Sequence, residues 1–222
     1  MSAKPSLEDA LKQLLDAVEK SIAWAKNLNP VEGSGKSAKH FFYCPECLRV
    51  DVYFKNQVDY AKRKGKRIEC FKCKVEMRPV DEHFKAEYER AMRAFYEKVK
   101  SILERAWPIM DSWWLWKGVS DYLVNVDLVR VYFDYPTSLT LIREKRGAVK
   151  AYLYIHYLDD EEQLEKLLRL ISILREEGVK GEVQVDGRSD HCKVPEEKMR
   201  AQGFARAYEV KKLPHSDWIL EL

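Results

Sequence analysis

Apolar residues recur at helical spacing close to the start of the chain. They are Leu7, Leu11, Leu14, Leu15, Val18 and Ile22. Ser6-Leu7-Glu8-Asp9 has the form of a capping box with Asp in the place of Glu. The pattern predicts a helix that begins at residue 7 and runs to about Asn27. The next segment, residues 29–39, contains Pro and Gly and is typical of a flexible linker.

A second helix is predicted over residues 80–107. Its apolar stripe consists of Phe84, Tyr88, Ala91, Phe95, Val99, Ile102, Leu103 and Ala106. Asp81 is suited to cap its start, and we expect Pro108 to end it. A Trp-rich junction follows, with Trp107, Trp113, Trp114 and Trp116. Large aromatics at such a junction indicate a core between domains, with a patch that binds a protein partner as the alternative.

From residue 128 the pattern changes to that of strands. Three segments are rich in β-branched and aromatic residues, namely 128–135, 138–145 and 148–157. Residues 159–178 form a clear amphipathic helix with acidic residues in its first turn and Gly178 at its end. Two further strands, 182–187 and 204–212, flank a short helix at 195–202. The order β-β-β-α-β-α-β predicts a compact α+β sheet with helices on one face.

Composition restricts the class of protein. The chain has 222 residues, 46% of them hydrophobic, which suits one large domain or two small ones. No run approaches the ~18 apolar residues of a membrane span, and the charged N-terminus does not have the character of a secretory signal. Charged residues make up 34%, and amides are few, as in thermophilic proteins. We therefore expect an intracellular, cytoplasmic protein of thermophilic character, without a membrane partner.

Four of the five cysteines form two Cys-x-x-Cys pairs. Cys44 and Cys47 are separated from Cys70 and Cys73 by 22 residues. Two such pairs can enclose one Zn²⁺ in a tetrahedron of thiolates, a closed arrangement that is structural rather than catalytic. Residues 40–80 resemble a zinc ribbon, which implies two knuckles joined by a β-excursion and one structural zinc ion. The remaining sequence resembles no family that we recognise. The predicted units are 1–39 (helix and linker), 40–80 (ribbon), 81–118 (long helix and junction) and 119–222 (α+β).

Positive charge is concentrated around these cysteines. Residues 36–78 carry 12 Lys and Arg against 5 Asp and Glu, a net charge of +7, which leaves −4 for the rest of the chain. Gly65 suits a turn, so we expect the basic cluster at the tip of the ribbon. Cations contact phosphates and aromatics stack on bases, which favours nucleic acid over a merely solvated hairpin. The candidate contact residues are Tyr53, Lys62, Arg63, Lys64, Lys66, Arg67, Lys72 and Lys74.

Three further motifs have weaker interpretations. Gly33-Ser34-Gly35-Lys36-Ser37 looks like a phosphate-binding loop, but Pro30 stands at the leading Gly position and the flanks are wrong, so we expect no nucleotide. Asp186 with Glu209-Val210-Lys211 on a predicted strand resembles the D…E-x-K site of metal-dependent nucleases. Cys192 beside His191 is interpreted as a loop cysteine rather than a nucleophile. We expect His156 at a surface or an interface.

Taken together, the patterns favour a zinc-ribbon protein that binds DNA or RNA without catalysis, in replication, transcription or a related process. Two alternatives stay open. One is a metal-dependent nuclease that docks its substrate with the ribbon, and the other is a protein adaptor whose ribbon binds polypeptides.

Overall fold

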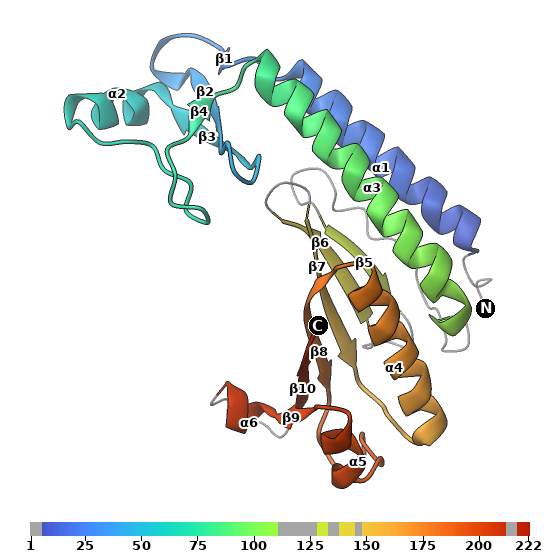
Figure 1. The fold of residues 1–222 in the computed structure, drawn as a ribbon. Helices are drawn as coiled ribbons and strands as arrows, with labels where there is room; N and C mark the ends of the chain where they lie inside the picture. The colour runs from blue at the N-terminus through green and yellow to red at the C-terminus, as the bar shows by residue number, and fades with distance from the viewer. Residues whose placement is uncertain (1–5, 111–127, 133–137, 145–147, 212–216) are drawn as a thin grey trace.

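The fold comes from a computed structural model that describes residues 6–110, 128–132, 138–144, 148–211 and 217–222 (Figure 1). It is an α+β protein with the predicted sequence of parts: an N-terminal helix, a cysteine-containing module, a long helix and a C-terminal sheet. Trp113, Trp114 and Trp116 lie outside the described residues, whereas Trp107 is buried at the end of the long helix.

Helices α1 (Leu7–Asn27) and α3 (Glu82–Met110) lie side by side along one edge of the molecule (Figure 1). The capping box is confirmed, because Ser6 Oγ accepts a hydrogen bond from the Asp9 N–H at 3.0 Å. Asp81 likewise accepts from the Phe84 N–H at 2.8 Å. The expected stop at Pro108 is wrong, since α3 continues to Met110. Proline removes one backbone hydrogen bond of the helix and restricts the conformation of the residue before it. So close to the end of a helix, the resulting loss of stability is small.

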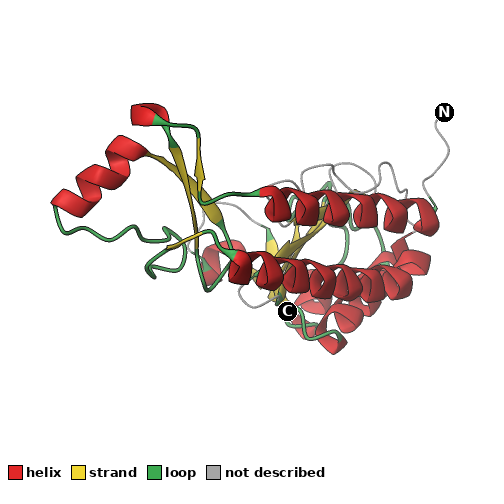
Figure 2. Cartoon of the chain, turned by 90° about the horizontal axis from the view of Figure 1, so that it is seen from above, coloured by secondary structure: helices red, strands yellow, loops and turns green. Residues whose placement is uncertain are grey.

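The cysteine-containing module lies beyond one end of this helix pair (Figure 2). Its elements are β1 (Val31–Glu32), a 3-10 turn (Gly35–Ser37), β2 (Lys39–Tyr43), β3 (Val50–Phe54), α2 (Lys55–Arg63) and β4 (Arg78–Pro79). Strand β2 pairs antiparallel with each of the other three. Two expectations are corrected here. The predicted linker at 29–39 contains β1 and the 3-10 turn, and the predicted β-excursion contains α2.

A six-stranded sheet follows in the order β5-β6-β7-β8-β10-β9. Its strands are β5 (Leu128–Tyr132), β6 (Ser138–Arg143), β7 (Val149–Ile155), β8 (Lys180–Val185), β9 (Ala205–Arg206) and β10 (Trp218–Glu221). Helices α4 (Glu161–Glu176), α5 (Glu196–Ala201) and α6 (Ala207–Val210) lie between strands in the sequence. Among the described strands of this sheet, β7 and β8 pair in parallel, joined through α4, and the other neighbours pair antiparallel. The strand expected at 204–212 is wrong beyond Arg206, where α6 begins, and β10 was not predicted.

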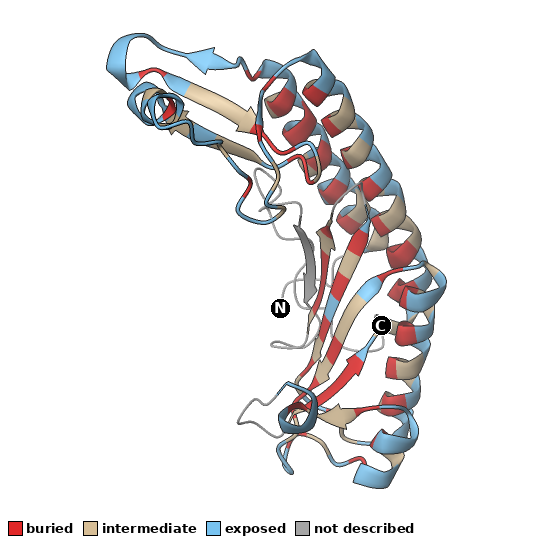
Figure 3. Cartoon of the chain, turned by 60° about the vertical axis from the view of Figure 1, so that its left-hand side comes forward, coloured by how far each residue is buried: buried red, intermediate tan, exposed pale blue. Residues whose placement is uncertain are grey.

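The core lies between this sheet and the helices α3 and α4 (Figure 3). Alternate residues of β7, such as Ala151, Leu153 and Ile155, are buried on the helix-covered face. The other face carries Lys150, Tyr152 and Tyr154. Asp160 caps α4 by accepting from the Gln163 N–H at 2.8 Å, and Gly178 follows its end with a φ of +68°. The predicted cover of one face by helices of this unit is therefore confirmed for α4, and α3, from a separate part of the chain, covers the same face.

Contacts between described residues attach the module to the rest of the chain. Arg143, at the end of β6, donates to the backbone oxygen of Cys47 at 3.3 Å. Lys72 pairs with Glu144 at 3.0 Å. The rings of Tyr43 and Phe84 lie 4.9 Å apart between centroids. The module is thus attached both to the sheet and to the start of α3.

Candidate metal centre and nucleic-acid interface

The four cysteines of the two Cys-x-x-Cys pairs lie together. Their Sγ atoms all lie within 4.8 Å of one another, and Cys47 Sγ is 3.8 Å from Cys70 Sγ. A tetrahedral zinc ion with Zn–S bonds of ~2.3 Å separates its sulfurs by about 3.8 Å. Cys44, Cys47 and Cys70 are buried, and Cys73 is partly exposed. The cluster is therefore compatible with a zinc-binding module.

The two knuckles repeat the same backbone geometry. In each, the carbonyl of the first cysteine accepts from the N–H four residues later at 2.8 Å, and its own N–H donates to the carbonyl five residues later at 2.9 Å. Leu48 and Lys74 occupy equivalent positions, one after the second cysteine, and both have a φ of +58°. Among the described residues they are the non-glycine residues with positive φ, a conformation that costs about 1–2 kcal/mol each. Matching strain in both knuckles indicates that the turns are shaped to bring thiols together.

The thiols have different proton affinities. Burial raises the pKa of the Cys47 thiol. Burial acts in the same sense on Cys70, yet its pKa is lowered, because the backbone N–H groups of Cys73 and Lys72 donate to its sulfur. A divalent ion binds thiolates and displaces such protons, so metal binding here is coupled to proton release.

The basic cluster lies at the end of helix α2 and in the turn that follows it. Lys62 and Arg63 are in the last turn of α2, and Lys64, Lys66 and Arg67 follow it. All five are exposed, as are Lys72 and Lys74 of the second knuckle. The cause is local: residues 55–63 are mostly good helix formers, and the Gln57 side chain accepts from the Phe54 N–H at 2.8 Å.

Several of these cations have no acidic partner. Within the described part of the chain, Lys62, Lys64, Lys66 and Lys74 form no ion pair. Lys72, by contrast, is held by Glu144. Arg67 lies 3.8 Å from Glu76, a distance at which an exposed pair contributes little. The surface therefore retains positive charge that is open to a ligand.

The aromatic residues around this surface differ in exposure. Tyr53, the predicted stacking residue, is half-buried and packs edge-on against Phe42 at 5.8 Å between ring centroids. Phe54, Tyr60 and Phe71 are more accessible, with exposed fractions of 47%, 50% and 59%. The guanidinium of Arg49 lies 4.3 Å above the Phe71 ring. The sequence indicates Phe54 and Tyr60 as aromatics close to the basic cluster, whereas it gives no signal for Phe71.

A basic recess lies between the 3-10 turn and α2. It has a volume of about 660 Å³ and is lined by Lys36, Lys55, Asn56, Asp59, Lys62 and Arg63. Lys36 belongs to the Gly-Ser-Gly-Lys-Ser segment, whose described neighbours are the short strands β1 and β2. A phosphate-binding loop requires a following helix, which is not found at this position. The segment instead contributes Lys36, one of the four cationic side chains that line this recess.

The D…E-x-K interpretation does not fit the local structure. Glu209 lies in α6 rather than on a strand, and it binds Arg200 at 2.8 Å. Lys211 is paired with Glu182 of β8. Asp186 is engaged by Arg188, whose Nη2 lies 2.7 Å from its Oδ2. Each member of the motif thus has a different partner.

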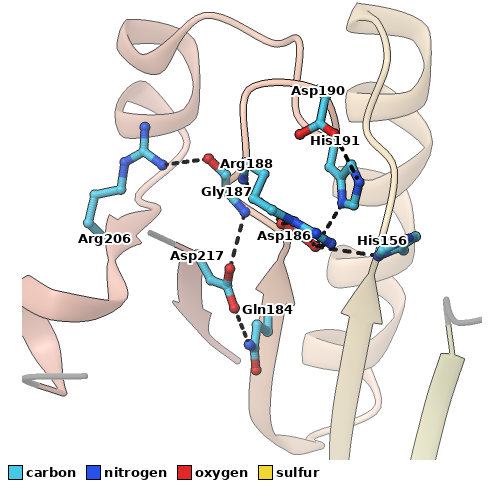
Figure 4. A network of polar contacts seen from close by, with 9 residues as sticks. All are labelled: His156, Gln184, Asp186, Gly187, Arg188, Asp190, His191, Arg206 and Asp217. Atoms are coloured by element: carbon cyan, nitrogen blue, oxygen red, sulfur yellow. Dashed lines mark hydrogen bonds and ion pairs between the residues drawn. The ribbon is translucent and has the colours of Figure 1, made fainter. Parts of the chain in front are cut away.

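A different group of residues meets at Asp186. His156, Asp186 and His191 present donor atoms within 4.8 Å of one another (Figure 4). In the sequence these three residues carry no common signal, and His156 is expected at a surface or an interface. A polar residue directly after each of two strands joined by a helical crossover is the signal that points to such a group. Cys192 is a loop residue, as expected, and burial raises the pKa of its thiol.

No protein-family model, curated protein or solved structure matches this chain. No helix in the described segments is both long enough and apolar enough to cross a membrane.

Proposed function

We propose that this chain binds DNA or RNA through the surface formed by the end of α2, the turn after it and the second knuckle. One observation carries the proposal: four exposed lysines that have no acidic partner among the described residues share a small module with three exposed aromatic rings. Lysines of this kind contact phosphates and release counterions, and exposed rings stack on unpaired bases. The net charge of +7 over residues 36–78, in a chain that is otherwise acidic, supports the same partner.

Zinc in the four-cysteine cluster has a structural role in this proposal. Four protein thiolates complete the tetrahedron and leave no position for water. The ion holds the second knuckle, and with it Lys74 and Phe71, against β2 and β3. Loss of zinc is therefore expected to abolish nucleic-acid binding indirectly.

The test is a charge reversal with a matched control. Lys62, Lys64 and Lys66 are changed together to Glu in one variant. Lys12, Lys20 and Lys180, which are exposed on α1 and β8, are changed to Glu in the other. Both variants change the net charge equally. Binding to labelled single-stranded DNA, duplex DNA and RNA is measured by fluorescence anisotropy between 50 and 200 mM salt.

The module variant is expected to bind all three ligands more weakly. Its slope of log affinity against log salt should be less steep by about 2 to 3, since each lost phosphate contact contributes about 0.7 to 0.9. The control variant should lose far less. Equal losses in the two variants, or binding that does not depend on salt, would reject the proposal and favour the adaptor alternative.

A second variant separates stacking from charge. Phe71→Ala is expected to weaken binding to single strands by about 1–3 kcal/mol and to leave duplex binding nearly unchanged, because only unpaired bases offer a free face. Tyr53→Ala is the comparison, since its ring is turned towards Phe42. If Tyr53→Ala weakens single-strand binding more than Phe71→Ala does, the ligand contacts the side of β3 that carries Tyr53.

A further inference from the structure

Three potential metal ligands converge beyond the carboxyl ends of β7 and β8. His156 follows β7 and Asp186 follows β8, and the parallel pair Ile155–Val185 sets these next residues side by side. His191 comes from the loop after β8. Its Nδ1 lies 2.8 Å from Asp186 Oδ2, and His156 Nδ1 lies 3.4 Å from the same oxygen (Figure 4).

The donor spacing suits a small divalent ion. Ligands bound tetrahedrally at ~2.0–2.2 Å stand about 3.3–3.6 Å apart. The separation of 3.4 Å between His156 and Asp186 falls in this range, and the 2.8 Å between His191 and Asp186 would have to widen as the ion replaces their hydrogen bond. Two imidazole nitrogens with one carboxylate oxygen form a donor set for transition ions such as Zn²⁺, Fe²⁺ or Mn²⁺. Mg²⁺ and Ca²⁺ prefer oxygen ligands throughout.

His191 faces a carboxylate at each ring nitrogen. Its Nδ1 faces Asp186 and its Nε2 lies 3.4 Å from Asp190 Oδ2. A neutral imidazole has a single N–H, so one of these contacts sets a lone pair against a carboxylate unless a proton or a cation lies between. With a metal ion at Nδ1, the Nε2–H donates to Asp190, which is the usual outer arrangement of a metal-bound histidine.

The surroundings hold the two imidazoles in place, and the guanidinium of Arg188 competes with a metal ion. The Tyr157 ring lies 4.3 Å from that of His156 and 4.6 Å from that of His191, between centroids. All three ligand side chains are largely buried. Arg188 binds the Asp186 carboxylate, but its side chain is 57% exposed and can move into solvent. Arginine and a metal ion therefore compete for Asp186 Oδ2.

We propose that His156, Asp186 and His191 bind one divalent transition-metal ion in a site separate from the four cysteines. Three protein ligands leave at least one coordination position for water or an anionic ligand, the arrangement found in catalytic rather than structural sites. The site goes beyond the proposed nucleic-acid surface and does not depend on it.

The metal content of the full chain tests this site. The protein is stripped, dialysed to equilibrium against micromolar Zn²⁺ and analysed for zinc per chain. Wild type is expected to hold two ions, and His156→Ala, His191→Ala and Asp186→Asn one each. His83→Ala, which removes an exposed histidine on α3, should keep two. Asp186→Asn preserves the shape of the side chain, and circular dichroism checks that each variant is folded.

Arg188→Gln gives a test in the opposite direction. Removing the competitor should tighten binding of the second ion by about tenfold, a change of the size that residues next to metal ligands can have on affinity. Loading with Co²⁺ separates the two sites, since the second equivalent should add weak visible absorption without further thiolate-to-metal charge transfer. One ion in wild type, two ions in His156→Ala and His191→Ala, or a weaker second ion in Arg188→Gln would overturn the proposal.

Discussion

The helix–sheet body and the cysteine-containing module have very different interiors. The body joins α1, α3, α4 and the sheet through one continuous apolar core, with side chains such as Phe95, Ile102 and Leu153 almost fully enclosed. The separate cluster of buried residues in the module consists of Cys44, Cys47, Cys70 and Met77. Helix α2 buries one residue, Val58. Apolar burial thus accounts for the body. The module's own cluster is small, and its Tyr43 and Leu48 pack into the core of the body instead.

This difference shows how a small unit can be ordered without a core of its own. Each buried aliphatic or aromatic side chain contributes about 1.5–3 kcal/mol, and the body contains many of them. The module replaces that contribution with four convergent thiols and with contacts to the body at Cys47, Lys72 and Tyr43. Units of this size commonly depend on a metal ion for stability.

Removal of zinc should give the largest effect and should affect the two regions unequally. Binding of a structural zinc ion contributes on the order of 10 kcal/mol to folding. After complete chelation, or in Cys70→Ser, residues 40–80 are expected to lose protection in amide hydrogen exchange, while α1, α3 and α4 keep theirs. Retained protection over residues 68–76 without metal would show that the module is stable by itself.

A cavity in the body should have the next largest effect. Phe95 is fully buried on α3, so Phe95→Ala is expected to lower the free energy of unfolding by about 3–5 kcal/mol. The matched change in the module is Phe54→Ala, at an exposed ring, with an expected loss within about 0.5 kcal/mol. Guanidinium denaturation measures both, and zinc content should be unchanged in both. Similar losses in the two variants would contradict a core confined to the body.

Two glycines extend the comparison to the backbone. Gly181 in β8 has a φ of +149°, and an added Cβ would lie 1.8 Å from the Ala151 carbonyl oxygen of β7. Gly181→Ala must therefore separate two paired strands, and we expect a loss of about 3 kcal/mol or more. Gly65, after α2, has a φ of +61° and open space around it, so Gly65→Ala should cost about 1 kcal/mol. Thermal unfolding of the two variants gives the ranking, and the reverse order would refute this account.

The sequence predicts those elements that carry their own start and stop signals. Helices α1 and α4 have apolar stripes with side-chain caps at Ser6 and Asp160, and Gly178 marks the end of α4. Helix α2 has one buried residue and therefore no apolar stripe that would predict a helix. The β-branched and aromatic residues before it lead instead to the prediction of a β-excursion. Strand β10 has four residues and owes its place to pairing with β8 and β9, which no local pattern reveals.

The two candidate metal sites show the same difference between features with a local sequence signal and features that depend on strand pairing. The four cysteines were recognisable because each pair lies within four residues, and the local turn brings its thiols together. His156 and Asp186 are thirty residues apart and meet only because β7 and β8 pair in parallel with one particular register. A shift of one residue would send the two side chains to opposite faces of the sheet. Residue types alone therefore could not identify this group.

The smallest effect expected is that of a polar contact within the body, which tests whether its stability is apolar throughout. Glu177, at the end of α4, accepts from Ser101 at 2.9 Å and pairs with Lys98 and Arg105 of α3 at 3.1 and 3.0 Å. Burial by itself would raise the pKa of Glu177, but these three donors lower it overall. Its contribution to stability is therefore present above the unfolded-state pKa of ~4.3 and is lost as the pH falls through the lower, folded value.

Glu177→Gln is accordingly expected to cost about 1–2 kcal/mol at pH 7, and the difference from wild type should narrow steadily below pH ~4. Glu104→Gln is the control, because within the described residues that exposed carboxylate has one ion pair, with Lys100 at 3.9 Å, and its loss should change stability little. Urea denaturation at a series of pH values measures both variants. A gap between Glu177→Gln and wild type that stays constant down to pH 3 would mean that the carboxylate charge is not the source of the effect. Packing of the side chain between α3 and α4 would then be responsible. Apolar contacts would then account for the stability of the body even where polar groups of the two helices meet.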